Sequence, residues 1–369
     1  MLTLVEREQR TGADIQEVKS SSGDRGSGPS PVIGKCVRVL DEGYVRLRDY
    51  LGDDYLIEEA ARQSYGEGTR KTSETQHLLR YLYRHGHSTP FEMGELLFIV
   101  RCPMDMSRQL IRHRAASMCE EGSMFDEPSV NEYSTRYSLA IDHAATTSPE
   151  AWRAQAKGNK QGSGDTVTQW PEGWQEKAVR SYIEGDNGSR NVMMDAKDEM
   201  RCVDPERPGD YLSGIETDLQ ERARFAYEER LQFGVAREQA RKDLPLSTYT
   251  QFYMKCDLRN MLHFFSLRLD SHAQYEIRQY AKAMAAFAEV LFPLTWQAFL
   301  DYDFRQGGLL LSAQDLTVLQ ELLKTYADVP IGRRDFAASL ASVGWPTEGS
   351  HREREECYAK LVRMGIFNK

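Results

Sequence analysis

Apolar and polar positions alternate along the chain in patterns that predict a few strands and many helices. The run from Leu96 to Val100 is apolar throughout and indicates a buried strand, while residues 248–255 alternate as a half-buried strand does. A short strand is predicted from Cys36 to Leu40. Helical spacing predicts helices over residues 44–51, 56–62, 74–85, 104–114, 215–233, 235–242 and 258–269.

The remaining periodicity is helical. A capping box of Ser271 and Gln274 predicts the start of a long helix that ends near Leu291. Further amphipathic helices are expected to begin near Ser312, Arg334 and His351. Few strands among many helices favour an α+β fold with one mixed, mainly antiparallel sheet covered by helices and a helical C-terminal extension.

Composition divides the chain into three segments. Residues 1–31 end in a stretch rich in Gly, Ser and Pro, which predicts a disordered tail. Residues 32–300 form the expected main domain, with long loops over 141–213, and residues 301–369 form the helical extension.

Charge and cysteine usage exclude several classes of protein. A net charge of -9 argues against a protein that coats nucleic acid, because such binding depends on a basic surface. No window approaches the ~18 consecutive apolar residues of a membrane span. The six cysteines form no Cys-x-x-Cys pair, so no metal is predicted and free thiols in a reducing cytoplasm are expected.

Basic residues gather between Arg108 and Arg114. Arg108 and Arg112 lie one helical turn apart, as do Gln109 and His113. Cations this close repel one another unless an anion lies nearby, so the segment is a candidate phosphate site. For a lone pair of arginines a solvated basic face would be the commoner interpretation, but the segments that follow favour a site.

Two later segments also suit a phosphorylated ligand. In an extended chain Glu132, Ser134 and Arg136 point the same way and could face one ligand. Arg259 and His263 are predicted on the helix face opposite a run of apolar residues. Polar side chains at these spacings predict a binding site assembled from several elements.

Single residues add to this set. Arg241 lies one helical turn after Arg237, and Arg268 lies near the end of a predicted helix. His87 precedes the buried strand, although a lone histidine in such a loop is more often structural.

Together these segments resemble the flavin-dependent thymidylate synthase family, whose signature is Arg-His-Arg followed by a serine-bearing segment. Several spaced motifs in the family's order, between about residues 36 and 300, are more specific than any one alone. The matching segments are Ala60–Gly66, His87–Glu92, Arg108–Gln109, Arg112–Arg114, Asn131–Tyr137, Ala240–Arg241 with Leu244–Pro245, Leu267–Arg268 and Ala273–Ile277.

The sequence departs from the family pattern at three places. Residues 118–129 form an acidic segment between Arg-His-Arg and the serine segment, where the family is compact. A competing register would use Glu121 and Ser123, but the later segment alone continues into Arg-Tyr. Met93 stands where the family has histidine, and Asp257 where asparagine is frequent.

The resemblance implies an enzyme that methylates dUMP to dTMP, with residues 32–300 as its catalytic domain. It implies FAD reduced by NADPH, methylenetetrahydrofolate as carbon donor, and a cytoplasmic homotetramer with flavin sites shared between subunits. The FAD ligands implied are Ser64, His87, Thr89, Arg112, His113, Arg114, Glu132, Arg259 and His263. The dUMP ligands implied are Gln109, Ser134, Arg136, Arg241 and Arg268.

Methylation of C5 of uracil requires a group that stabilises negative charge on the ring, and Arg268 is the candidate for this catalytic role. Ser134 is assigned to substrate binding, because its own segment offers no histidine or lysine to act as its base. A nucleotide-binding or RNA-binding protein without catalysis, or another flavoenzyme acting on a nucleotide, are the alternatives.

Overall fold

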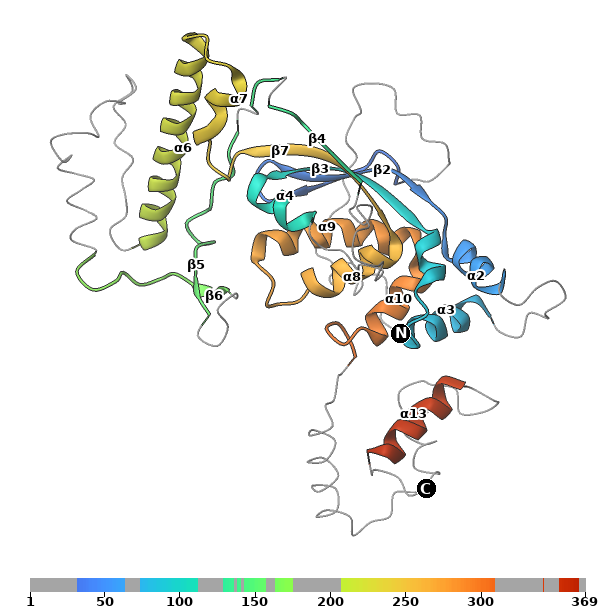
Figure 1. Cartoon of the computed structure of the whole chain (residues 1–369). Coiled ribbons are helices and arrows are strands. Elements are labelled where there is room, and N and C mark those ends of the chain that lie inside the picture. Colours follow the sequence, from blue (N-terminus) through green and yellow to red (C-terminus); the bar gives the residue numbers. More distant parts are fainter. Residues whose placement is uncertain are drawn as a thin grey trace, which may run out of the picture.

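The structure, a computed structural model, describes residues 32–63, 74–111, 129–135, 138–140, 143–156, 163–174, 207–308, 341 and 352–364. Its centre is a five-stranded sheet with the order β1-β2-β3-β7-β4, in which each pairing is antiparallel. The strands are β1 (Cys36–Val39), β2 (Gly43–Leu51), β3 (Glu95–Pro103), β4 (Ser129–Glu132) and β7 (Tyr249–Asp257). Helices lie against one face of this sheet (Figure 1), so the predicted α+β architecture is confirmed.

Strand β2 corrects the helix predicted over residues 44–51. Val45 and Leu47 are fully buried, while Arg46 between them and Arg48 after them are partly exposed, which is the period-2 pattern of a strand. Strand β3 pairs with β2 from Tyr44 to Leu51, with a register shift between Leu47 and Asp49, and this pairing fixes the conformation. Long side chains such as arginine are compatible with helix, so local propensity was overridden by sheet pairing.

Three helices fill the core beneath the sheet. Phe98 of the sheet packs on Phe287 with ring centroids 5.9 Å apart. Phe265 packs on Trp296 at 5.6 Å in an edge-to-face arrangement. Such aromatic contacts add to the large apolar area that these rings bury. The helices are α8 (Leu258–Arg268), α9 (Tyr275–Leu291) and α10 (Pro293–Tyr302).

A group of shorter elements closes the opposite end of this core. Asp54 is buried and its carboxylate accepts hydrogen bonds from the backbone N–H groups of Leu294 (2.7 Å) and Thr295 (3.0 Å), at the first turn of α10. Buried Glu58 binds Arg62 and also Thr75, and so ties α2 to α3. The elements are α2 (Asp54–Arg62), α3 (Thr75–Arg84) and η2 (Thr89–Met93), while α4 (Met104–Leu110) follows β3 at the other end of the sheet and contacts α9 (Figure 1).

A long helix stands beside the sheet (Figure 1) and is held to it by the chain around residue 147. Thr147 donates its backbone N–H to Glu216, and Ser213 donates its hydroxyl to the Thr147 carbonyl. The helix ends before Gly234, whose φ of 76° suits glycine, as the sequence predicts. These elements are β5 (Arg153–Gln155), β6 (Ser163–Thr166), α6 (Pro208–Gln232), α7 (Arg237–Ala240) and η3 (Arg241–Asp243).

Two predictions for the C-terminal half concern the start of α9 and the helices that follow α10. The capping box is wrong: Gln274 is the N-cap of α9 without a side-chain cap, and the Ser271 carbonyl instead accepts from Arg278. The last predicted helix is present as α13 (Arg352–Arg363), whereas the helices expected near Ser312 and Arg334 lie outside the described residues. In the described part of the chain, no helix combines the length and apolar character that crossing a membrane requires.

Candidate active site

The first group of polar side chains lies on the outer face of α8. Asp257 caps this helix by accepting the backbone N–H of Asn260 at 2.8 Å, so β7 leads directly into α8. The apolar face of α8, with Leu262 buried, points into the core, and the opposite face carries Arg259 and His263. The predicted placement of these two residues is confirmed.

Positive charge surrounds His263. Partial burial lowers the pKa of its imidazole, and the neighbouring cations Arg305 and Arg259 lower it further. Arg305 is held in place because its Nη1 donates to Ser266 Oγ at 3.2 Å. Arg259 Nη1 reaches Glu92 Oε1 of η2 at 3.2 Å. The carboxylate of Asp303 opposes these effects on His263, so the surface holds two arginines, whose guanidinium groups can bind phosphate, beside the two carboxylates of Glu92 and Asp303.

The chain between α3 and η2 carries two further predicted FAD ligands, His87 and Thr89. Both residues are exposed. The chain turns at Gly86, which has a φ of 70°, and the His87 N–H returns to the Leu82 carbonyl at 2.9 Å. Because η2 also supplies Glu92, the contact with Arg259 connects this segment to the α8 surface.

A second group lies where α8 ends and α9 begins. Gln109 of α4 donates from Nε2 to Gln274 Oε1 at 2.7 Å. Arg268 is the last residue of α8 and precedes Gln274 by a short connection. Burial lowers the pKa of the Arg268 guanidinium, so its charge lies in a poorly solvated environment. The structure therefore places two predicted dUMP ligands near the start of α9.

A third group lies at the β4 edge of the sheet. Arg241 Nη1 donates to the Thr135 hydroxyl, which brings this guanidinium to the segment that contains Ser134. Glu132, the last residue of β4, accepts a hydrogen bond from Thr250 Oγ1 at 2.7 Å. The serine segment and Arg241 are far apart in sequence, and the structure brings them together as a phosphate site requires.

Five predicted site residues lie outside the described residues: Ser64, Arg112, His113, Arg114 and Arg136. Glu121 and Ser123 of the competing register lie outside them as well. Sequence reasoning missed Arg305, since it lies in a segment without a recognisable motif. Arg305 follows α10, a helix that the sequence analysis did not predict, and a lone arginine at such a position gives no signal of its own.

Comparison with known proteins identifies the chain's relatives. Residues 46–294 match the family model described as thymidylate synthase complementing protein. A flavin-dependent thymidylate synthase from Ruegeria pomeroyi is 40% identical over 285 residues, which are 77% of this chain and 79% of that protein. One from Thermus thermophilus is 37% identical over 318 residues, which are 85% of this chain and 97% of that protein.

The chain belongs to the flavin-dependent thymidylate synthase family.

A solved structure agrees with this membership. It is a UMP/dUMP methylase, PolB from Streptomyces cacaoi, bound with 5-Br dUMP. The two chains share 28% identity with a TM-score of 0.52, over 72% of this chain and 98% of that chain. The family match ends at residue 294, so the sequence-predicted residues of the three groups fall within it, while Arg305 and α13 lie beyond it.

Family membership also puts two of the departures in context. At Asp257 both carboxylate oxygens are engaged with Asn260, one with its backbone N–H and one with its side-chain amide at 2.6 Å. An asparagine offers one acceptor oxygen in place of two, so the aspartate strengthens the cap. Met93 ends η2 and is exposed, where it contributes no polar contact to the site.

Proposed function

We propose that this protein makes dTMP by reductive methylation of dUMP, with FAD as its cofactor, NADPH as reductant and methylenetetrahydrofolate as carbon donor. The observation that carries the proposal is the family match across residues 46–294, which contains every residue assigned a role. When bound, the flavin supplies the hydride that completes the methyl group, a task that no protein side chain performs.

The chemistry of the α8 surface fits a flavin dinucleotide. FAD carries a pyrophosphate, and the guanidinium groups of Arg259 and Arg305, which add to the effect of burial in lowering the pKa of His263, would favour such an anion. Arg259 and His263 would bind FAD, and His87, Thr89 and Glu132 would bind it as well. Ser64, Arg112, His113 and Arg114 complete the set on the strength of the motif alone. In the proposed homotetramer these residues come from more than one subunit.

The dUMP phosphate would be held at the β4 edge. The contact between Arg241 and Thr135 supports this, because it brings a guanidinium to the segment that contains Ser134. Arginine recognises phosphate with two parallel N–H donors, which orients the nucleotide as well as binding it. Gln109, held by Gln274, would position the uracil end.

Arg268 would act on the uracil ring itself. C5 becomes nucleophilic when the uracil ring carries negative charge, and a nearby fixed cation lowers the energy of that charged state until the new bond to the folate-borne carbon uses the electron pair. Partial burial increases this effect, because the interaction between charges grows as the local dielectric falls. Ser134 would bind substrate through its hydroxyl and would not act as a nucleophile.

The decisive variant is Arg268→Lys, which keeps the charge and removes the planar fork. Loss of one well-placed donor typically lowers the rate by about 10² to 10³. We expect kcat for dTMP formation to fall in that range at saturating dUMP, with the flavin spectrum unchanged. The matched control is Arg222→Lys on the exposed surface of α6, which should turn over normally.

Two results would contradict the proposal. Near-normal turnover of Arg268→Lys would leave Arg268 as a cation at the end of a helix, where lysine substitutes well. A wild-type protein that binds dUMP but no flavin would support the alternative, a nucleotide-binding protein without catalysis. Because the structurally similar protein PolB from Streptomyces cacaoi is a UMP/dUMP methylase, UMP and dUMP should be tested separately as substrates.

A further inference from the structure

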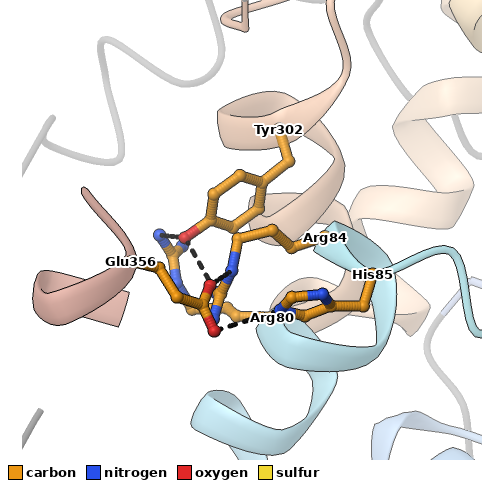
Figure 2. Close-up of polar contacts among 5 residues, drawn as sticks. All are labelled: Arg80, Arg84, His85, Tyr302 and Glu356. Carbon is orange, nitrogen blue, oxygen red and sulfur yellow. Dashed lines mark hydrogen bonds and ion pairs between the residues drawn. The ribbon is translucent and has the colours of Figure 1, made fainter. Parts of the chain in front are cut away.

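The C-terminal helix α13 contacts the end of α3 through one carboxylate (Figure 2). Glu356 Oε2 accepts a hydrogen bond from Arg84 Nε at 2.5 Å, and Glu356 Oε1 lies 3.0 Å from His85 Nε2. The partners are more than 270 residues apart in sequence. Helix α13 also lies beyond the region that matches the family, so this contact is a property of the extension.

The surface that receives Glu356 is itself well defined. The Arg84 side chain is only 8% exposed, and its guanidinium lies 5.2 Å from the centre of the Tyr302 ring of α10. Arg80, one turn earlier on α3, donates to the Tyr302 hydroxyl at 3.0 Å and pairs with Asp301. Figure 2 shows Glu356 closing this cluster from the side of α13.

The ionised state of Glu356 is strongly favoured. Partial burial opposes ionisation, yet the hydrogen bonds and charges of Arg84 and His85 hold the pKa of Glu356 at about 2. The contact is therefore charged throughout the physiological range of pH. A charge-assisted pair of this geometry is more directional than apolar packing, so it fixes the orientation of its partners.

His85 connects this cluster to the candidate flavin site. It is the C-cap of α3, where the chain turns through Gly86 into His87. The ring of Tyr81 contacts both histidines, with centroid distances of 4.4 Å to His85 and 5.7 Å to His87. Any change in the orientation of His85 therefore acts on His87 through the short turn and through the shared aromatic contact.

We propose that Glu356 is a positioning residue, which acts from α13 through His85 to fix the segment His85–Thr89 against the flavin site. The inference rests on the proposed function, since His87 and Thr89 are assigned there to FAD. It adds that the C-terminal extension takes part in cofactor binding without touching the cofactor. It also explains why one carboxylate on an extension outside the family match is bound so closely by α3.

The test compares Glu356→Gln with Glu355→Gln, the same chemical change at the exposed neighbouring position of α13. We expect Glu356→Gln to raise the dissociation constant of FAD roughly three- to tenfold, which lies within the range for coupling carried through packed contacts. Amide hydrogen exchange at Gly86, His87 and Ser88 should become faster in this variant. Glu355→Gln should match wild type in both measurements.

A second variant, with a conservative substitution, distinguishes loss of the contact from misfolding. Glu356→Asp retains the charge on a shorter side chain, so it should restore part of the FAD affinity that Glu356→Gln loses. Equal FAD affinity and equal exchange in Glu356→Gln and Glu355→Gln would overturn the inference. If wild type binds no FAD, the proposed function fails, while the exchange measurement still decides whether Glu356 orders the segment.

Discussion

The helical core beneath the sheet and the helix α13 are held in place by different forces. The core is a layer of interlocking rings, with Phe265 and Phe299 fully buried. Helix α13 is held at α3 by the charged contacts of Glu356. Apolar packing is strong and insensitive to pH, whereas a charged contact is weaker and adjustable. The comparison indicates that loss of the Glu356 contacts should leave the helical core intact.

The largest effect is expected in the core. Phe265 is fully buried and contacts the rings of Trp296 and Phe299, at centroid distances of 5.6 and 6.5 Å. Phe265→Ala should lower the free energy of unfolding by about 3–5 kcal/mol, through lost burial and the cavity left behind. Urea denaturation measures this loss. A cost below about 1 kcal/mol would mean that the rings do not hold the core.

A smaller effect is expected from two adjacent aspartates. Asp54 is buried and accepts the N–H groups of Leu294 and Thr295, so Asp54→Ala should cost about 1–3 kcal/mol by leaving buried donors unsatisfied. Asp53 caps α2 at an exposed position, so Asp53→Ala should cost only about 1 kcal/mol. Thermal unfolding of both variants tests the order, and equal costs would refute the role of burial.

The contact of α13 should contribute less and should depend on pH. The pKa of Glu356 is about 2 in the folded chain, below its ordinary value of 4.5. A carboxylate with a lowered folded pKa stabilises the fold fully above its ordinary pKa, and this contribution is lost as pH falls from about 4.5 toward 2. For a partly exposed pair the contribution is about 1 kcal/mol or less.

The measurement is the difference in unfolding free energy between wild type and Glu356→Gln. It should shrink as the pH is lowered from about 5 to about 3, because glutamine has no proton to gain. Glu355→Gln serves as the control for the general effect of removing one negative charge from α13. A difference that grows over this range would show that the Glu356 carboxylate is not the titrating group.

The smallest effect on turnover is expected from the buried thiols. Burial raises the pKa of Cys102 and Cys256, so both stay protonated and unreactive at neutral pH. Cys102→Ala and Cys256→Ala should therefore retain kcat, and any loss should be confined to stability. An inactive variant that is folded and binds flavin would show that the substituted thiol takes part in the reaction.

Local pattern was sufficient for much of this fold. The apolar run at residues 96–100 and the alternation at 248–255 correspond to β3 and β7, since both lie in the middle of the sheet. The helix predicted over residues 44–51 was wrong, because arginine and tyrosine do not discriminate strand from helix. Pairing with β3 makes this segment a strand. Strand pairing is a long-range contact that periodicity does not record.

In the candidate site, too, local pattern predicts some features and not others. The outward direction of Arg259 and His263 follows from helical spacing and was predicted correctly. The contact between Arg241 and Thr135, and that between Glu356 and Arg84, join segments remote in sequence, so no local pattern predicts them. Arg305 reaches the α8 surface from beyond the family match, where motifs give no guidance.

The most direct test of the central claim is product analysis of the purified protein, with dUMP, methylenetetrahydrofolate and NADPH. The reaction is run after removal of flavin and again after FAD is restored, and dTMP is separated by chromatography. We expect dTMP in the presence of FAD and none in its absence. Equal dTMP without FAD, or no dTMP from a protein that binds both FAD and dUMP, would contradict it.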